Sequence, residues 1–552
     1  MIVRHAPFDH AWRLLVPALC LLAATAARAA DSVAPGDYAR HIAALASDAF
    51  EGRRPASEGG EKTVAYLVDE LRKLGAVPVG EGGYVQPVPL VEVTPLPEPT
   101  LEFATPAGTS HARFGLDAVV FTKRQVPTAA VAASPVVFVG YGVVAPEYGW
   151  NDYAGIDMRG KTALILINDP GFATGDETLF RGRALTYYGR WTYKFEEAAR
   201  QGAAAAIIVH ETVPAAYGWA TVVNSWANPQ LDMQAADARA GRVAIEGWIT
   251  QEFATALLAS AGRDFETLKK AANARGFRAV PLDARASASV RNTLRASNSA
   301  NVLAMLPGSK RPREYLFYLA HWDHLGRGQG GEGDQTFNGA VDNATGTAGL
   351  LAIAAAFARA PVRPERSVVF LAVTAEEQGL LGSEYYVAHP RAPLADTVAV
   401  FNMDALYFGG ATRDVRIVGA GASDLERHLA EEAARRGLAV VPEAQPEKGH
   451  FYRSDHFNFA QAGVPALYLK TGIDDVDGGV AAGMAREADF IANRYHQVGD
   501  NFVPGARLEA GLEVVDLIYA VGRRLANETA FPNWNADNEF RAARDRSRDA
   551  RQ

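Results

Sequence analysis

The stretch RSVVFLAVTAEEQGLLGS, from Arg366 to Ser383, joins an apolar run to two adjacent acidic residues. The run up to Ala372 is short, apolar and rich in β-branched side chains, which predicts a buried strand. Glu376 and Glu377 follow where that strand would end, and glycines follow them. Neighbouring carboxylates repel one another, and charge is costly at the end of a buried strand. The pair therefore needs either solvent or a partner of opposite charge.

A repeated order of strand, loop and helix extends outward from this stretch, beginning at Asn301. Alternation of this kind predicts an α/β fold with a mainly parallel sheet sandwiched by helices. The predicted strands lie within residues 314–324, 366–377, 397–404 and 464–472. The predicted helices lie within residues 343–360, 423–438 and 508–527.

Length and composition set broader limits. A chain of 552 residues is longer than one core usually holds, so two or three domains are expected. Hydrophobic residues make up 48% and charged residues 21%, which is typical of a globular protein. The formal net charge of -8 argues against a nucleic-acid partner, because phosphate binding requires a basic face.

The first 29 residues have the pattern of a secretory signal peptide. Arg4 and Arg13 supply positive charge, LLVPALCLLAATAA is the apolar segment, and Ala27–Ala29 form an A-x-A cleavage site. The apolar segment is too short to span a bilayer, so we expect export to a periplasm or beyond, without stable membrane insertion. Cys20 is the only cysteine, so the mature chain would have neither disulfides nor thiolate metal ligands.

Ionisable residues gather at the predicted carboxyl ends of the strands, where open α/β sheets bind ligands. Carboxylates alone would repel one another, and histidine with Asp or Glu is a ligand set for zinc, with cobalt or manganese possible. The set exceeds what one tetrahedral ion needs, so we expect two ions about 3.5–4 Å apart that share a carboxylate. The residues are His321, Asp323, Asp342, Glu376, Glu377, Asp404 and His496.

Five stretches in this half of the chain resemble, in order, the metal-site motifs of the M28 family of zinc exopeptidases. They are AHWDHLG, NGAVDNATGTAGLL, VTAEEQGLLGS, FNMD and YHQVGDN. The family includes aminopeptidases and glutamate carboxypeptidase-like enzymes. The resemblance implies the zinc exopeptidase fold, two zinc ions and a peptide substrate.

Residues 134–171 resemble the protease-associated (PA) domain that some M28 members carry as an insertion. With this resemblance, the chain divides into five parts. They are a signal peptide at 1–29, a first peptidase segment at 30–97, a smaller PA-like α+β domain at 98–292, a second peptidase segment with the metal site at 293–530, and a polar C-terminal tail at 531–552.

The resemblance also implies which residues hold the metals. Asp342 would bridge the two zinc ions. His321 and Asp404 would complete one site, and Glu377 and His496 would complete the other.

Three further roles follow from the same resemblance. Glu376 would be the general base, which takes a proton from the water between the metals and returns it to the leaving amine. Asp323 would orient the imidazole of His321. Tyr495 would donate a hydrogen bond to the tetrahedral oxyanion, and packing on the loop is its other interpretation.

Some features stay open. Asp455 and His456 would either line the substrate pocket or hold their loop in place. The loop at 325–341 is long and rich in glycine, and YHQVGDN lacks the proline and threonine expected in the last motif.

The sequence thus predicts an exported metallo-exopeptidase, and an N-terminal specificity is favoured. A glutamate carboxypeptidase-like enzyme is the first alternative, and it would need arginines in the pocket. A catalytically silent peptide-binding ectodomain is the second, and retention of all five ligands and of Glu376 argues against it. The candidate arginines are Arg181, Arg183, Arg190 and Arg453.

Overall fold

The computed structural model describes residues 32–548, apart from 98, 227–228, 329–332 and 537, and also residue 551. The predicted signal peptide lies outside the described residues. The chain forms two compact units: unit 1 combines Met1–Pro87, Ala300–Pro442 and Asp455–Gln552, and unit 2 combines Val88–Ser299 and Glu443–Ser454. Unit 2 contains the predicted insertion at 98–292 and also takes in residues 443–454, which come from the peptidase half of the sequence.

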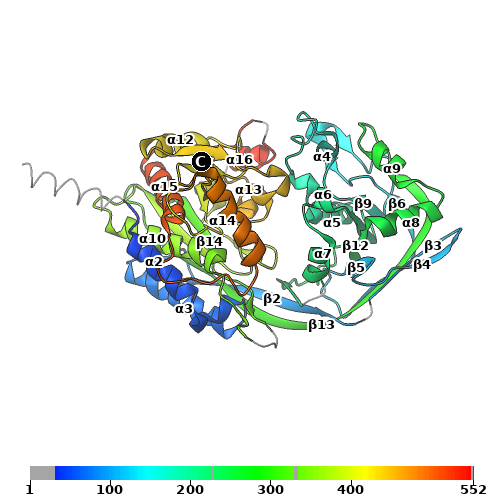
Figure 1. Ribbon diagram of the computed structural model, residues 1–552, viewed down its shortest axis with the longest axis horizontal. Coiled ribbons are helices and arrows are strands. Elements are labelled where there is room, and N and C mark those ends of the chain that lie inside the picture. Colours follow the sequence, from blue (N-terminus) through cyan, green and yellow to red (C-terminus); the bar gives the residue numbers. More distant parts are fainter. Residues whose placement is uncertain are drawn as a thin grey trace, which may run out of the picture. The chain divides into compact units, whose positions relative to one another are not determined.

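Unit 1 is built on a mixed sheet whose central strands are parallel (Figure 1). The parallel strands are, in spatial order, β17 (Arg366–Val373), β14 (Arg311–His321), β18 (Thr397–Asn402) and β21 (Ala466–Thr471). Antiparallel pairing continues the sheet on both sides, through β13 (Val280–Leu306) beside β17 and β19 (Asp414–Ile417) beside β21. The outer strands are β1 (Val77–Pro78) and β20 (Ala439–Pro442).

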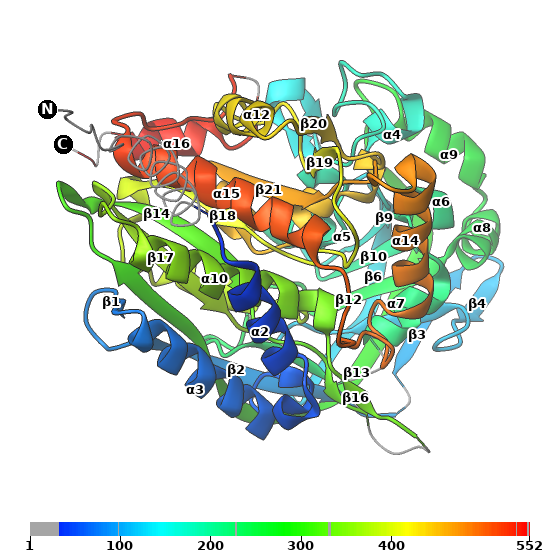
Figure 2. The same ribbon diagram turned by 60° about the vertical axis from the view of Figure 1, so that its left-hand side comes forward.

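Alternation along β14 places successive side chains against different helix layers. The ring of Tyr318 contacts Phe357 of α10 (Thr345–Arg359), and its hydroxyl lies 3.4 Å from the carbonyl oxygens of Ile518 and Tyr519 in α15 (Glu509–Asn527). Phe317 instead contacts Tyr386 of α11 (Leu381–Ala388) and Phe459 of α13 (His456–Gln461). The sheet is therefore covered on both faces, and the predicted fold class is confirmed. Figure 2 shows α10 and α15 on one face of the sheet with α2 (Pro35–Leu45). The other helices of unit 1 include α3 (Glu58–Lys73), α12 (Leu425–Arg435), α14 (Gly479–Asn493) and α16 (Arg541–Arg548).

Helix α10 is the most apolar helix of the core. Among the described residues, Ala340–Arg359 is the one segment long and apolar enough to cross a membrane by composition. The apolar part of this segment is fully buried inside the fold, so packing in the core accounts for its apolar composition.

Unit 2 has its own sheet and its own core. β9 (Thr162–Leu166) pairs in parallel with β6 (Thr128–Phe138) and β10 (Ala205–His210), and β10 pairs in parallel with β12 (Ile245–Thr250). The main helices are α5 (Trp191–Arg200), α8 (Gln251–Ser260) and α9 (Phe265–Ala272). Shorter helices and strands complete the unit. They are β2 (Val85–Pro95), β3 (Thr100–Thr105), β4 (Gly108–His111), β5 (Ala118–Phe121), β7 (Val144–Ala145), β8 (Trp150–Asn151), α4 (Pro170–Thr174), α6 (Thr212–Ala215), α7 (Trp219–Trp226) and β11 (Gln230–Met233). This is an α+β arrangement, and its relation to PA domains stays a prediction.

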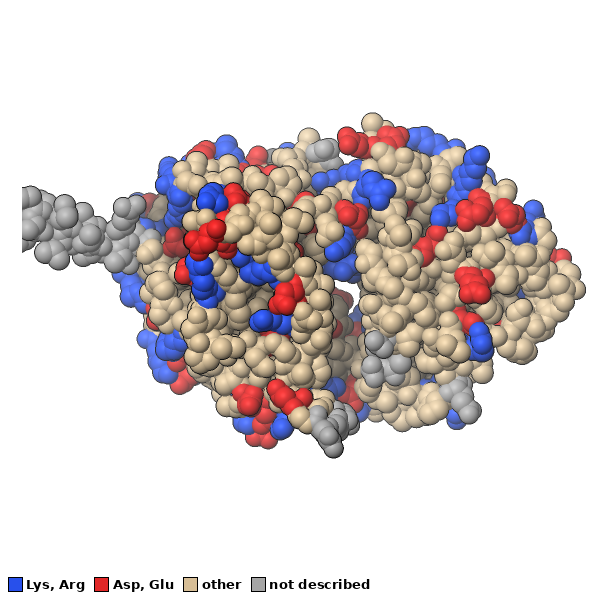
Figure 3. Space-filling model, in the orientation of Figure 1, with Lys and Arg blue, Asp and Glu red and all other residues tan. Residues whose placement is uncertain are grey.

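Charge is mixed over the surface that Figure 3 shows. Lys and Arg side chains alternate there with Asp and Glu side chains, and the described residues on this face form no continuous basic area.

Two glycines in helices of unit 1 test how tightly the core is packed. A Cβ at Gly522 of α15 would overlap the Tyr318 hydroxyl and lie 3.0 Å from the ring of Phe401, whereas a Cβ at Gly36 of α2 would meet nothing within 4 Å. We expect Gly522→Ala to lower the free energy of unfolding by about 1–3 kcal/mol through overpacking. Gly36→Ala should raise it by about 0.4–1 kcal/mol.

Urea unfolding followed by circular dichroism measures both changes. Equal effects of the two substitutions would contradict the packing described for α15 against β14.

Candidate metal centre

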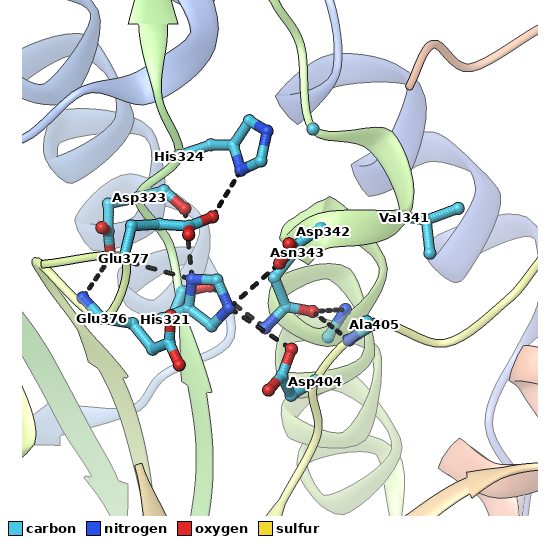
Figure 4. A network of polar contacts seen from close by, with 12 residues as sticks. His321, Asp323, His324, Val341, Asp342, Asn343, Glu376, Glu377, Asp404 and Ala405 are labelled. Atoms are coloured by element: carbon cyan, nitrogen blue, oxygen red, sulfur yellow. Dashed lines mark hydrogen bonds and ion pairs between the residues drawn. The ribbon is translucent and has the colours of Figure 1, made fainter. Parts of the chain in front are cut away.

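A cluster of ionisable side chains lies at the carboxyl ends of the parallel strands of unit 1 (Figure 4). β14 ends at His321, β17 is followed by Glu376 and Glu377, and β18 by Asp404. Asp342 precedes α10, which packs against β14 and β17. The sheet thus brings together residues that are far apart in sequence, at the edge where α/β folds bind ligands.

The first group of candidate ligands is centred on His321. Its Nε2 lies 3.4 Å from Asp342 Oδ1 and 3.4 Å from Asp404 Oδ1. All three side chains are buried or nearly so. Two ligands held about 2.0–2.1 Å from one tetrahedral zinc ion are roughly 3.3 Å apart. The spacing therefore fits ligands around a shared cation.

The second group is centred on His496. Its Nε2 lies 3.2 Å from Asp342 Oδ2 and 3.0 Å from Glu377 Oε2. Asp342 thus presents one oxygen to each histidine. The five residues predicted as metal ligands come together in two groups that share one carboxylate.

Burial makes the negative charge of this site costly. Burial alone would raise the pKa of Asp342, but His321 and His496 outweigh it and hold that pKa well below its usual range. Burial raises the pKa of Glu376 well above its usual range, and Asp404 adds to the effect. Burial also raises the pKa of Asp323 to about 7. Divalent cations would relieve this repulsion, so the donor set and its electrostatics fit two metal ions.

Asp323 connects a candidate ligand to the turn after β17. Its backbone oxygen lies 3.2 Å from His321 Nδ1, and its Oδ1 lies 3.8 Å from the same nitrogen. The same Oδ1 accepts a hydrogen bond of 3.1 Å from the backbone N–H of Glu376. Asp323 therefore orients the His321 ring mainly through its carbonyl, while its carboxylate fixes the backbone beside the two glutamates.

A tight turn after β17 leads into Glu376 and Glu377. β17 ends at Val373, and Ala375 has a left-handed backbone with a φ of 53°. The Asn301 side chain accepts the N–H of Thr374 at 3.1 Å and donates to the carbonyl of Gly382 at 2.8 Å. Figure 4 shows the two glutamate side chains leaving this turn in different directions. Both glutamates lie beyond the end of β17, so the turn determines the different surroundings of the adjacent carboxylates.

Asn343 fixes the start of α10 against the end of β18. Its side-chain oxygen accepts from the N–H groups of Gly346 at 2.9 Å and Ala405 at 3.2 Å, and its nitrogen donates to the carbonyl of Met403 at 3.0 Å. The peptide bond between Asp342 and Asn343 is cis. These hydrogen bonds hold Asp342 and Asp404 on neighbouring segments.

Two residues of the site were not singled out from the sequence. His324 Nδ1 lies 2.7 Å from Glu377 Oε1. The carboxylate of Asp500 accepts from the N–H of Val341 at 2.9 Å and of Asp342 at 3.0 Å, and burial raises its pKa to about 6. His324 lies in the stretch AHWDHLG and Asp500 in YHQVGDN, each within four residues of a candidate ligand. This closeness in sequence is the signal that could have identified them.

The remaining predicted residues surround the cluster. The ring of Tyr495 stacks on His496 with centroids 4.0 Å apart, and 45% of the tyrosine is exposed. Asp455 Oδ1 accepts the Ser383 hydroxyl at 2.6 Å, and His456 Nδ1 lies 3.3 Å from Asn402 Nδ2.

Asp455 and His456 are fully buried, which matches the loop-holding role more closely than a surface open to substrate. The arginines considered for a carboxypeptidase, Arg181, Arg183, Arg190 and Arg453, belong to unit 2.

The fold is the α/β fold of the zinc exopeptidases, and its site is a cluster of candidate metal ligands at the carboxyl edge of the sheet. Residues 301–506, which contain all five candidate ligands, match the model of peptidase family M28. The family resemblance predicted from the sequence motifs is thus found again in this part of the chain.

Two relatives match shorter parts of the chain. Aminopeptidase NAALADL1 of Rattus norvegicus is 34% identical over 137 residues, which cover 24% of this chain and 17% of the relative. Leupeptin-inactivating enzyme 1 of Streptomyces exfoliatus is 32% identical over 175 residues, which cover 32% of this chain and 36% of the relative. The chain thus covers well under two thirds of each relative.

An aminopeptidase from Aneurinibacillus sp. strain AM-1 has a similar structure, with a TM-score of 0.52 and 21% identity, over 92% of this chain and 98% of that one. This likeness shows the fold.

Substitutions of Asp500 test how the loop that carries Asp342 is held in place. Asp500→Ala would leave two buried N–H groups without an acceptor, at about 1–3 kcal/mol each. Asp500→Asn keeps one acceptor oxygen and should cost less. We expect the unfolding free energy of the metal-free protein, measured in urea, to fall in the order wild type, Asn, Ala. Equal stability of the Asn and Ala variants would contradict this account.

Proposed function

We propose that the protein is an exported di-zinc exopeptidase that acts as an aminopeptidase. The observation that carries the proposal is the sharing of Asp342 between two histidine–carboxylate groups. The match to peptidase family M28 supports peptide hydrolysis, and relatives named aminopeptidases favour the amino terminus of the substrate. Export rests on the sequence of residues 1–29.

The residues that would hold the metals follow from the two groups. His321, Asp342 and Asp404 would hold one zinc ion, and Asp342, Glu377 and His496 the other. When bound, two divalent cations supply Lewis acidity for the scissile carbonyl and lower the pKa of water. Cobalt or manganese could replace zinc with these ligands.

The chain's own groups would handle the proton and the developing charge. Glu376 stands beside the ligands with a pKa raised well above its usual range by burial, so its carboxylate can accept a proton and later release it to the leaving amine. Tyr495, stacked on His496, is the candidate hydrogen-bond donor to the oxyanion. Asp323 holds both His321 and the Glu376 backbone in position.

The two adjacent glutamates should respond differently to the same substitution. Glu376→Gln should leave the zinc content near that of the wild type and lower kcat by orders of magnitude, because it removes the proton acceptor and keeps the ligands. Glu377→Gln should lose zinc from one site. Zinc per chain, measured by plasma emission spectrometry after dialysis, and kcat together separate the two roles. Equal zinc loss in both variants would contradict the division.

The direction of attack on the substrate is the second test. A panel of aminoacyl chromogenic substrates and dipeptides, with free and blocked termini, should be cleaved only where the amino terminus is free. A chelator should abolish cleavage, and zinc or cobalt should restore it. Preferential cleavage of substrates with a blocked amino terminus and a free acidic carboxyl terminus would favour the carboxypeptidase alternative. Absence of cleavage by the protein with two zinc ions bound would favour a peptide-binding ectodomain.

A further inference from the structure

His324 is a third histidine in the cluster, and the roles assigned above do not use it. It lies three residues after His321 in the loop that follows β14, and its side chain is fully buried. Figure 4 shows its ring directed at Glu377, where Nδ1 lies 2.7 Å from Oε1. The other oxygen of Glu377, Oε2, lies 3.0 Å from His496 Nε2. The two oxygens of this carboxylate thus face different partners.

His324 lies close enough to Asp342 and Glu377 to be a metal ligand itself, and its short contact with Glu377 is what distinguishes it from the five candidate ligands. Pairs of candidate ligand atoms in the two groups lie 3.0–3.4 Å apart, as expected for atoms around a shared zinc ion. The His324–Glu377 distance of 2.7 Å is instead that of a charge-assisted hydrogen bond. A carboxylate offers only lone pairs, so the hydrogen of this bond must be on Nδ1 of the imidazole.

The other ring nitrogen agrees with this assignment. Among the described residues, no hydrogen-bond partner faces the buried Nε2 of His324. An acceptor nitrogen tolerates that position better than a donor would, because orphaned N–H groups are rarer in folded proteins. The structure therefore favours the tautomer with its hydrogen on Nδ1.

The ring is also held firmly in place. A Cβ at Gly339 would lie 2.5 Å from Cγ of His324, so the ring packs directly on the backbone of the loop that carries Asp342. Gly339 has a φ of +54°, which suits glycine. The backbone N–H of His324 donates to the carbonyl of Arg53 at 3.3 Å. His324 is thus fixed between Glu377 and the loop of the shared ligand.

A comparable donor serves the first group of ligands. Asp404 presents Oδ1 to His321 at 3.4 Å, and its Oδ2 accepts the Tyr468 hydroxyl at 3.3 Å. In each group, one carboxylate therefore has one oxygen for the cation and one for a buried donor. The bond from His324 is the shorter of the two.

We propose that His324 is a positioning residue for the second cation site: its Nδ1–H engages Oε1 of Glu377 and leaves only Oε2 for the cation. With Oε1 held by His324, Glu377 would offer one oxygen to a bound cation, which suits a catalytic zinc site because such sites keep a position open for water or substrate. The inference rests on the proposed function, because it concerns the second of the two proposed metals. On this account, the affinity of the second site for a cation depends on His324 as well as on the ligands themselves.

The test compares three substitutions at this position. Asn places its side-chain nitrogen where His has Nδ1, Gln reaches the position of Nε2, and Ala has no donor. Metal-free wild type and variants are titrated with zinc in a calorimeter, with cobalt absorption as a second signal. We expect His324→Ala and His324→Gln to weaken zinc binding at the Glu377–His496 site, called here the second binding event, by about 10–100-fold. Binding at the His321–Asp404 site, called the first event, should be unchanged. His324→Asn should restore the second event toward wild type.

A control variant addresses the other site. Tyr468→Phe removes the donor to Asp404, and we expect it to weaken the first binding event rather than the second. The positions of the urea unfolding transitions of all metal-free variants show whether a variant has simply failed to fold. Selective loss of the second event in a folded His324→Ala protein supports the inference. Unchanged affinity of the second event in that variant overturns it.

Two further outcomes would also overturn the positioning role. X-ray absorption of the protein with two zinc ions should show one imidazole per zinc on average, from His321 and His496. A higher average would make His324 a ligand. Equal behaviour of the Asn and Gln variants would remove the role of the Nδ1 donor.

Peptidase assays keep this result separate from the proposed function. A protein that binds two zinc ions with the expected dependence on His324 but cleaves no peptide would refute the function and leave the inference standing. An active aminopeptidase whose His324→Ala variant binds the second zinc normally would refute the inference alone.

Discussion

The site of unit 1 depends on one electrostatic constraint: the fold buries more negative charge than its own cations neutralise. Histidines offset part of that charge, yet the pKa of Glu376 is still raised well above its usual range by burial. Isolated buried carboxylates are too costly to be retained unless a cation compensates them. A cation bound at the carboxyl edge of the sheet would therefore compensate this charge. The carboxylates are Asp323, Asp342, Glu376, Glu377, Asp404 and Asp455.

Holding repelling groups together requires a rigid frame, and the frame here is largely backbone. Ala375, Ala405 and His496 all have left-handed backbones, with φ of 53°, 52° and 56°. Each of these residues is a candidate ligand or lies next to a residue of the site. A left-handed backbone costs about 1–3 kcal/mol in a residue other than glycine. The side chains of Asn301 and Asn343 fix the turns at Ala375 and Ala405 by hydrogen bonds to the backbone. Packing of the sheet between its helix layers thus sustains backbone strain beside the candidate ligands.

Much of this arrangement follows from local features of the sequence. Apolar runs of strand length locate β14, β17 and β18, and the ionisable residues at their ends mark the cluster. His324 and Asp500 were missed because their partners are remote in sequence: Glu377 is 53 residues from His324, and Val341 is 159 residues from Asp500. Periodicity cannot reveal such pairs. It also cannot show that residues 443–454 pack with unit 2, since that depends on tertiary contacts.

The different roles proposed for the adjacent glutamates have a geometric basis as well as a family resemblance. Both oxygens of Glu377 are engaged, one facing His496 and the other accepting from His324. A carboxylate held on both sides is poorly placed to exchange a proton. The carboxyl group of Glu376 makes no hydrogen bond with the residues that the structure describes, while its backbone N–H is tied to Asp323. Its backbone is fixed and its carboxylate is available, which is the combination that a general base requires.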